Sequence, residues 1–270
     1  SIGCSANAFI CVAKEGNVSH AIAPWAWGMA VTAAIYVCGG VSGGHVNPAV
    51  TLGLASVCKI KWYKIFHYFA AQYLGAFLGA AVTYGVYHEA ITNTFGAELQ
   101  TIGVNGTAGI FGTFSNENIS TSTAVIDQIV ATAFFLLVIN AITDEKNMAC
   151  PKGLIPIAIG ITDLGLLIFA FGYNCGAPIN PARDFAPRVF TALAGWGNEV
   201  FTAHDYYFWV PLVCCHIGGV LGSWIYRLFI ELHWPEASYE LAPTQPDESE
   251  QVFYKIINAT RRSKSQVEPL

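Results

Sequence analysis

The sequence contains little charge. Asp, Glu, Lys and Arg make up 11% of its 270 residues, whereas soluble domains contain about 25%. No charged residue occurs between Glu15 and Lys59, and no Lys or Arg occurs between Lys64 and Lys146. The lack of a basic cluster argues against a nucleic-acid partner, and an apolar fraction of 54% argues against a disordered chain. This composition is typical of an integral membrane protein.

The chain also lacks cysteines at ligand spacing. Its 8 cysteines are scattered through apolar stretches, apart from the adjacent pair Cys214 and Cys215, and no CxxC motif occurs. We interpret them as small buried hydrophobic residues and expect no metal site. No nucleophile has a base at motif spacing. The sequence therefore predicts neither a cofactor nor an enzyme.

Several segments are apolar and long enough to span a bilayer as helices, which takes about 20 residues. They are roughly 24–41, 62–87, 123–142, 154–171 and 206–232. The apolar stretch before Lys14 is too short to span, and the sequence begins with Ser1 rather than Met. We therefore expect most of a first helix to lie upstream. The predicted fold class is all-α integral membrane.

The distribution of basic residues predicts the topology, because Lys and Arg concentrate in cytoplasmic connections. The connection 89–122 contains neither residue and carries two glycosylation sequons, and a third sequon precedes Pro24. We expect these to be extracellular and the C-terminus to be cytoplasmic, in a plasma-membrane protein. A membrane domain over 1–234 would have two halves, near 1–115 and 116–234, and 235–270 would be a flexible cytoplasmic tail. The basic residues of two other connections and of the tail are Lys59, Lys61, Lys64, Lys146, Lys152, Lys255, Arg261, Arg262 and Lys264, and the candidate glycosylation sites are Asn17, Asn105 and Asn118.

Two segments do not fit the spanning pattern, and they resemble each other. Each has a glycine-containing approach, then Asn-Pro-Ala, then an apolar run too short to cross a membrane. The approaches contain Gly43, Gly44 and His45 in one copy and Gly176 in the other, and the motifs are Asn47-Pro48-Ala49 and Asn180-Pro181-Ala182. The copies would enter from opposite faces. This arrangement is the signature of an inverted repeat with two half-helices that meet near the midplane.

Asn-Pro-Ala suits the start of a half-helix inside a membrane. Asn is a good N-cap, and Pro at the first helical position has no N–H to leave unsatisfied. Asn47 and Asn180 would present amide donors to a solute oxygen, and the two positive helix ends would repel cations. A glycine-rich extended approach would line the path with carbonyl acceptors, since irregular backbone at this depth must border a cavity or protein.

The paired motifs resemble those of the aquaporin, or major intrinsic protein, family, over about residues 27–232. Within it the sequence is similar to the aquaglyceroporin branch, because Asp184 follows Arg183 and because Ala194-Gly-Trp-Gly197 and Pro211-Leu212 are present. The resemblance implies six helices with two re-entrant half-helices, the first helix mostly missing here. It also implies a homotetramer with one pore per subunit.

The resemblance places a selectivity ring by spacing. Its members would be Trp27, Arg183, Ala177 and one bulky aliphatic residue. Counting back from Asn180 makes the aliphatic residue Ile168. Counting forward from residues 156–160 makes it Leu167, because this helix is one residue longer than usual. Such a ring lacks the His of water-selective members and suits a small polyol, whose CH groups contact Trp27 while its hydroxyls bond Arg183. We predict a passive channel for glycerol, water and other small uncharged solutes that excludes protons and ions.

Other assignments stay open at this stage. The pore could instead select water, or pass ammonia, urea or metalloid hydroxides, or be closed in a structural membrane protein. A secondary transporter would need coupling carboxylates, for which Asp163 and Asp127 are the available residues. His45 could hold its loop or respond to pH, and Gln128 is expected to support a re-entrant loop through buried hydrogen bonds. Asp163 has no counterpart in the family pattern.

Overall fold

The computed structural model describes residues 1–13 and 22–235, and every regular element within them is helical. Ser1–Leu232 form one compact unit, and His233–Leu270 are a separate one. Asn17 and the expected tail 236–270 lie outside the described residues.

Within the described residues, four helices are long and apolar enough to cross a membrane, α2, α4, α5 and α10. The N-terminal α1 and the middle helix α6 are shorter, α8 is as long as α6, and α3, α7 and α9 are shorter still. The α-helices are α1 Ile2–Ala13, α2 Ile22–Ser42, α3 Pro48–Ser56, α4 Ile65–Phe95, α5 Thr121–Thr143, α6 Ile155–Gly165, α7 Gly172–Cys175, α8 Pro181–Thr191, α9 Glu199–Tyr206 and α10 Trp209–Phe229. Single turns of 3₁₀- or π-helix are η1 Trp62–Lys64, η2 Ala108–Ile110, η3 Leu166–Ala170, η4 Ala192–Trp196 and η5 Glu231–His233.

Two boundaries differ from the sequence prediction. Helix α4 continues to Phe95 instead of ending near residue 87, and Gly96, with φ 94°, ends it. The last spanning helix begins at Trp209 rather than near residue 206, because His204 and Asp205 have φ 52° and 55° and interrupt the helical backbone. In each case the helix ends or begins within a stretch whose hydropathy does not change, so hydropathy alone does not locate the end of the helix.

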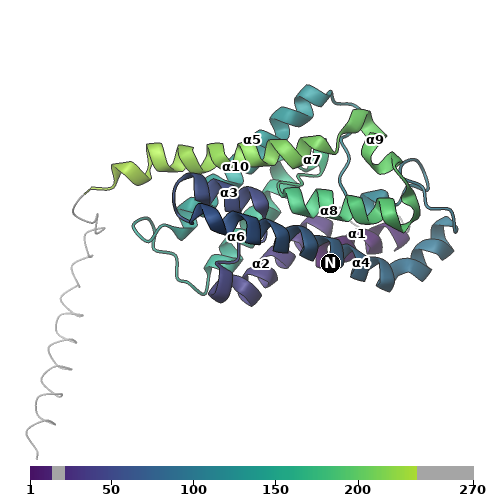
Figure 1. The fold of residues 1–270 in the computed structure, drawn as a ribbon, viewed down its shortest axis with the longest axis horizontal. Coiled ribbons are helices and arrows are strands. Elements are labelled where there is room, and N and C mark those ends of the chain that lie inside the picture. The colour runs from purple at the N-terminus through teal and green to yellow at the C-terminus, as the bar shows by residue number, and fades with distance from the viewer. Residues whose placement is uncertain (14–21, 236–270) are drawn as a thin grey trace, which may run out of the picture. The chain divides into compact units, whose positions relative to one another are not determined.

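Glycines on α10 allow its close packing against α5 and α3. A Cβ on Gly222 would lie 2.0 Å from the carbonyl oxygen of Ala133 in α5, and one on Gly219 would lie 2.6 Å from that of Ala49 in α3. Small residues let backbones approach in this way when lipid supplies no hydrophobic drive. Helix α10 therefore runs directly beside α5 and supports the first half-helix (Figure 1).

Helices α2 and α6 cross at a second contact of this kind. A Cβ on Gly28 of α2 would lie 2.6 Å from the Gly160 carbonyl oxygen, and one on Gly160 would lie 2.5 Å from the Gly28 carbonyl oxygen. This crossing fixes Asp163 of α6 and, in the turn η3 that follows, Leu167, and both line one cavity together with Trp27 of α2.

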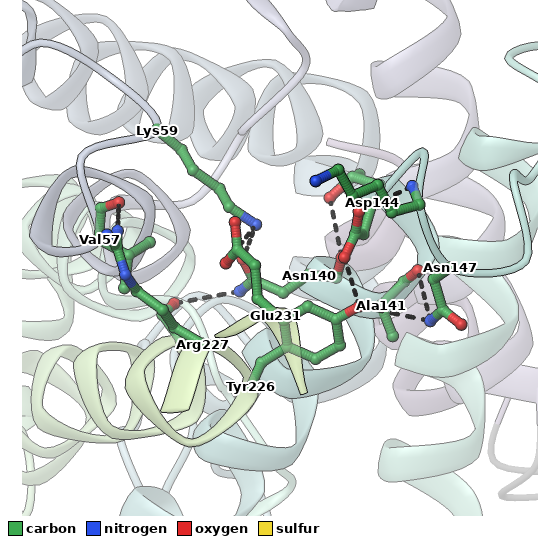
Figure 2. A network of polar contacts seen from close by, with 12 residues as sticks. Val57, Lys59, Asn140, Ala141, Asp144, Asn147, Tyr226, Arg227 and Glu231 are labelled. Carbon is green, nitrogen blue, oxygen red and sulfur yellow. Dashed lines mark hydrogen bonds and ion pairs between the residues drawn. The ribbon is translucent and has the colours of Figure 1, made fainter. Parts of the chain in front are cut away.

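A polar network ties the C-terminal end of α10 to the end of the half-helix α3 (Figure 2). Arg227 donates a hydrogen bond to the Val57 carbonyl, and Lys59 lies 3.4 Å from Glu231. Lys59 Nζ also donates to Asn140 Oδ1 at 3.0 Å, which joins α5 to the same end. The half-helix is thus held at its C-terminal end by side chains from both spanning helices.

Candidate functional site

The two Asn-Pro-Ala motifs meet, and each asparagine binds the other copy. Asn47 Nδ2 donates to the Ile179 carbonyl at 2.8 Å, and Asn180 Nδ2 donates to the Val46 carbonyl at 2.9 Å. Each side-chain oxygen also caps its own half-helix, Asn47 through Ala49 N–H at 2.8 Å and Asn180 through the N–H groups of residues 182 and 183. Because a primary amide has two N–H groups, each asparagine keeps one donor beyond the cross-bond.

The carbonyls that accept these bonds come from residues with unusual backbone conformation. Val46 has φ 44° and Ile179 has φ 37°, a region that β-branched residues rarely adopt. Gly43, Gly44 and Gly176 also have positive φ, between 67° and 80°, so these approaches are left-handed at the glycines rather than extended as predicted. Strain of this kind persists only where the surrounding structure determines it, and it concentrates at functional sites.

Two cavities, of about 620 and 600 Å³, border the site. The first contains His45, Asn180 and Asp163 in its lining, and the second contains residues of α1 and of the loop before α5. Trp27, Leu167 and Arg183 line both. These three side chains therefore lie where one cavity gives way to the other.

Arg183 is held in place from two sides. Its Nη1 donates to the Phe111 carbonyl at 3.0 Å, and its guanidinium carbon lies 3.9 Å from the centre of the Trp27 ring. Trp27 Nε1 in turn donates to Asn7 Oδ1 of α1 at 3.4 Å. A cation over a tryptophan face at this distance is attracted by the ring. Among the described residues, the Phe111 carbonyl is the hydrogen-bond acceptor of the Arg183 guanidinium.

The other predicted ring members are Ala177 and Ile168. Ala177 is buried and lines the first cavity. The Ile168 side chain lies outside the described residues, whereas Leu167, the alternative left open by the spacing, lines both cavities. Leu167 and Ile168 both lie in the π-turn Leu166–Ala170. The hydrogen bond from the Phe171 N–H to the Leu166 carbonyl closes this turn. Such a turn is the usual way in which a helix accommodates one extra residue, often at functional sites.

Asp184 organises the loop that holds Arg183. Its carboxylate is fully buried and accepts from the Thr113 N–H at 2.7 Å and the Thr113 hydroxyl at 2.6 Å. It also forms an ion pair of 3.0 Å with Arg188, which donates to the carbonyls of Thr113 and Val200. Asp184 therefore fixes the segment that contains the Phe111 carbonyl.

His45 and Gln128 both make hydrogen bonds. His45 Nδ1 lies 3.1 Å from the Thr51 hydroxyl, within the first half-helix, and its ring also borders the first cavity. Gln128 donates to Asp127 at 2.8 Å, and Asp127 accepts from Asn174 at 2.7 Å. Gln128 therefore reaches the second re-entrant segment through Asp127, and it also has a side-chain hydrogen bond with Cys175 of that segment.

The two described sequons differ in exposure. Asn118 is exposed, and Ser120 of its sequon is the exposed N-cap of α5. Asn105 is half-buried, and Thr107 of its sequon is buried with its hydroxyl accepting from Trp196 Nε1 at 3.0 Å.

Four residues that hold the site were not predicted, namely Asn7, Phe111, Thr113 and Arg188. Of these only Arg188 leaves a signal in the sequence, because it follows Asp184 by four positions and so shares a helix face with it. Phe111 acts through its backbone carbonyl, and Thr113 acts through its N–H and carbonyl as well as its hydroxyl, so the sequence gives little sign of either role.

Comparison with known proteins agrees with this geometry. The family model described as "Major intrinsic protein" matches residues 1–226. Aquaporin-9 of Homo sapiens is 45% identical over 87% of this chain and 78% of its own length, and Aquaporin-3 of Milnesium tardigradum is 40% identical over 93% and 78%. The solved aquaglyceroporin from Plasmodium falciparum superposes with a TM-score of 0.76 at 32% identity, covering 86% of this chain and 91% of that one. The chain belongs to the major intrinsic protein family.

Proposed function

We propose that this chain is a passive channel for glycerol, water and other small uncharged solutes, which pass between Trp27, Leu167 and Arg183. The observation that carries the proposal is that these three side chains line both cavities. Membership of the major intrinsic protein family and the similarity to aquaporins and to a solved aquaglyceroporin support the same solute class.

The chemistry of the ring favours a polyol. Trp27 and Leu167 provide apolar surface for CH groups, while Arg183 provides N–H donors for hydroxyls. Ala177 adds little volume, which leaves room for a three-carbon solute beside the leucine. A pocket with mostly apolar walls and a few placed donors selects by orientation as well as by size.

At the centre, Asn47 and Asn180 would orient the solute oxygen with their remaining N–H groups. The starts of α3 and α8 both carry the positive end of a helix dipole, roughly half an elementary charge each. These ends and Arg183 would oppose the entry of protons and other cations.

Further features of the proposal concern the whole protein. We propose that it has no catalytic activity, assembles as a homotetramer, and lies in the plasma membrane with a cytoplasmic C-terminus. Asn118 is the better supported glycosylation site, because both Asn118 and Ser120 are exposed.

The test is stopped-flow light scattering of proteoliposomes under a glycerol gradient. Wild-type vesicles should swell faster than protein-free vesicles, and Ala177→Trp should abolish the difference by filling the ring. Val37→Trp is the matched control, because Val37 is 84% exposed on α2 and should tolerate the same residue. Water flux without glycerol entry would contradict the polyol assignment in favour of a water channel, and the absence of both fluxes would favour a closed pore.

A further inference from the structure

Helix α6 carries a carboxylate, Asp163, whose side chain reaches the first cavity. Asp163 is only 5% exposed, yet it lines this cavity together with Arg183 and Asn180. It lies in α6, four residues before Leu167, which follows in the π-turn Leu166–Ala170. Four helical residues correspond to about 6 Å along the axis, or roughly one turn.

The position of Asp163 along the path follows from these contacts. Leu167 borders both cavities, whereas Asp163 borders the cavity that contains Asn180 and His45. Asp163 therefore lines the cavity on the side of the ring that contains the meeting point of the half-helices. A solute in the ring is within one helical turn of the carboxylate.

Nothing in the described part of the chain neutralises this carboxylate through a direct contact. The ion pairs there are Lys59–Glu231 and Arg188–Asp184, and no hydrogen bond joins the Asp163 side chain to a described residue. A buried carboxylate without a partner is costly, and ionisable residues inside membrane helices mark solute pathways. Asp163 lines the first cavity, and its carboxyl oxygens are hydrogen-bond acceptors.

We infer that Asp163 is a solute-binding residue that accepts hydrogen bonds from the two adjacent hydroxyls of a 1,2-diol, the unit that glycerol contains. An ionised carboxylate has two acceptor oxygens and no donor, so a vicinal diol can donate one hydroxyl to each. Arg183 supplies the complementary donors for the third hydroxyl or for the lone pairs of the same solute.

The inference rests on the proposed glycerol channel and adds a specificity that the ring alone does not give. Trp27, Leu167 and Arg183 would accept any slender alcohol. A site built to bond two hydroxyls at fixed separation discriminates against isomers in which they lie apart, because one acceptor is then left unpaired.

The experiment compares 1,2-propanediol with 1,3-propanediol, which have the same composition and nearly the same size. Their permeabilities are measured in proteoliposomes that contain the full chain as wild type, Asp163→Asn or Asp163→Glu. In wild type we expect the 1,2-isomer to pass faster. In Asp163→Asn the ratio of the two permeabilities should fall by about fivefold, the effect of losing one net hydrogen bond. Asp163→Glu should restore the preference, since it returns both oxygens.

The matched control is Asp205→Asn, which makes the same chemical change at an exposed residue that lines neither cavity. It should leave the ratio unchanged. A wild type that conducts glycerol but whose isomer ratio is unaltered by Asp163→Asn would overturn this inference alone. A wild type that passes neither glycerol nor either diol would overturn the proposed function and the inference together. If Asp163→Asn does not assemble, a wild-type level of 1,2-preference in Asp163→Glu supports the inference, and its absence counts against it.

Discussion

Replacing Asp184 by Asn tests whether the buried ion pair supports the channel. The side chains of Asp184 and Arg188 are 0% and 1% exposed. An amide has one acceptor oxygen, so Asn at this position can serve Thr113 or Arg188 but not both. Removing one partner of a buried pair typically costs about 3–5 kcal/mol, because the other charge remains buried. We expect a loss of this size in the free energy of unfolding.

The control for Asp184→Asn is a second ion pair in the same protein. Lys59 and Glu231 are 3.4 Å apart, but their side chains are 27% and 31% exposed. Exposed pairs contribute about 0–1 kcal/mol. Glu231→Gln should therefore destabilise far less than Asp184→Asn, although both substitutions remove one carboxylate.

The assay is reversible unfolding in mixed micelles by an increasing fraction of denaturing detergent, followed by tryptophan fluorescence. The Arg188→Gln variant and the double variant complete a cycle, in which the double variant should be less destabilised than the sum of the singles. Glycerol flux should also fall in Asp184→Asn, because the Thr113 segment holds the Phe111 carbonyl against Arg183. The reasoning is refuted if Asp184→Asn and Glu231→Gln cost the same, or if the single effects add.

Three other outcomes follow from the structure. Gly222→Ala should destabilise the protein in the same unfolding assay, because its Cβ would meet the Ala133 carbonyl oxygen at 2.0 Å, whereas Gly85→Ala, with nothing within 4 Å, should not; equal effects would contradict the close packing of α10. Asn180→Asp should raise proton and sodium leak, measured with a pH-sensitive dye and by current, since it places a negative charge at the helix ends that repel cations; an unchanged leak would count against this barrier. Trp27→Ala should let longer polyols such as the five-carbon xylitol enter in the swelling assay, and continued exclusion of xylitol would place the size limit elsewhere.

The motifs and the half-helices could be predicted from the sequence because their signals are local. Asn followed by Pro identifies a capped helix start, and the shortness of the following apolar run identifies a half-helix. The bonds from Asn47 and Asn180 to opposite carbonyls could not be predicted. They require Val46 and Ile179 to adopt a left-handed conformation that their own side chains disfavour, and only the opposing copy determines it.

Leu167 shows a second limit of sequence reasoning. The spacing revealed one extra residue in the helix, but two positions remained open for the ring. The π-turn over Leu166–Ala170 absorbs the extra residue, and Leu167 is found on both cavities. Where a helix places an insertion depends on its neighbours, here Gly172, on which a Cβ would lie 2.0 Å from the Leu167 carbonyl oxygen.

The crossed asparagine bonds have a consequence for how the channel is made. Asn47 is synthesised 132 residues before the carbonyl it binds, so the first half leaves the ribosome with its central amide unsatisfied and with Val46 free to relax. The pore centre forms only when the second half docks. At that point the Val46 carbonyl accepts from Asn180 and the Ile179 carbonyl accepts from Asn47. A defect in either half therefore prevents the docking of the two halves. It leaves the central asparagine of the other half without its carbonyl partner as well.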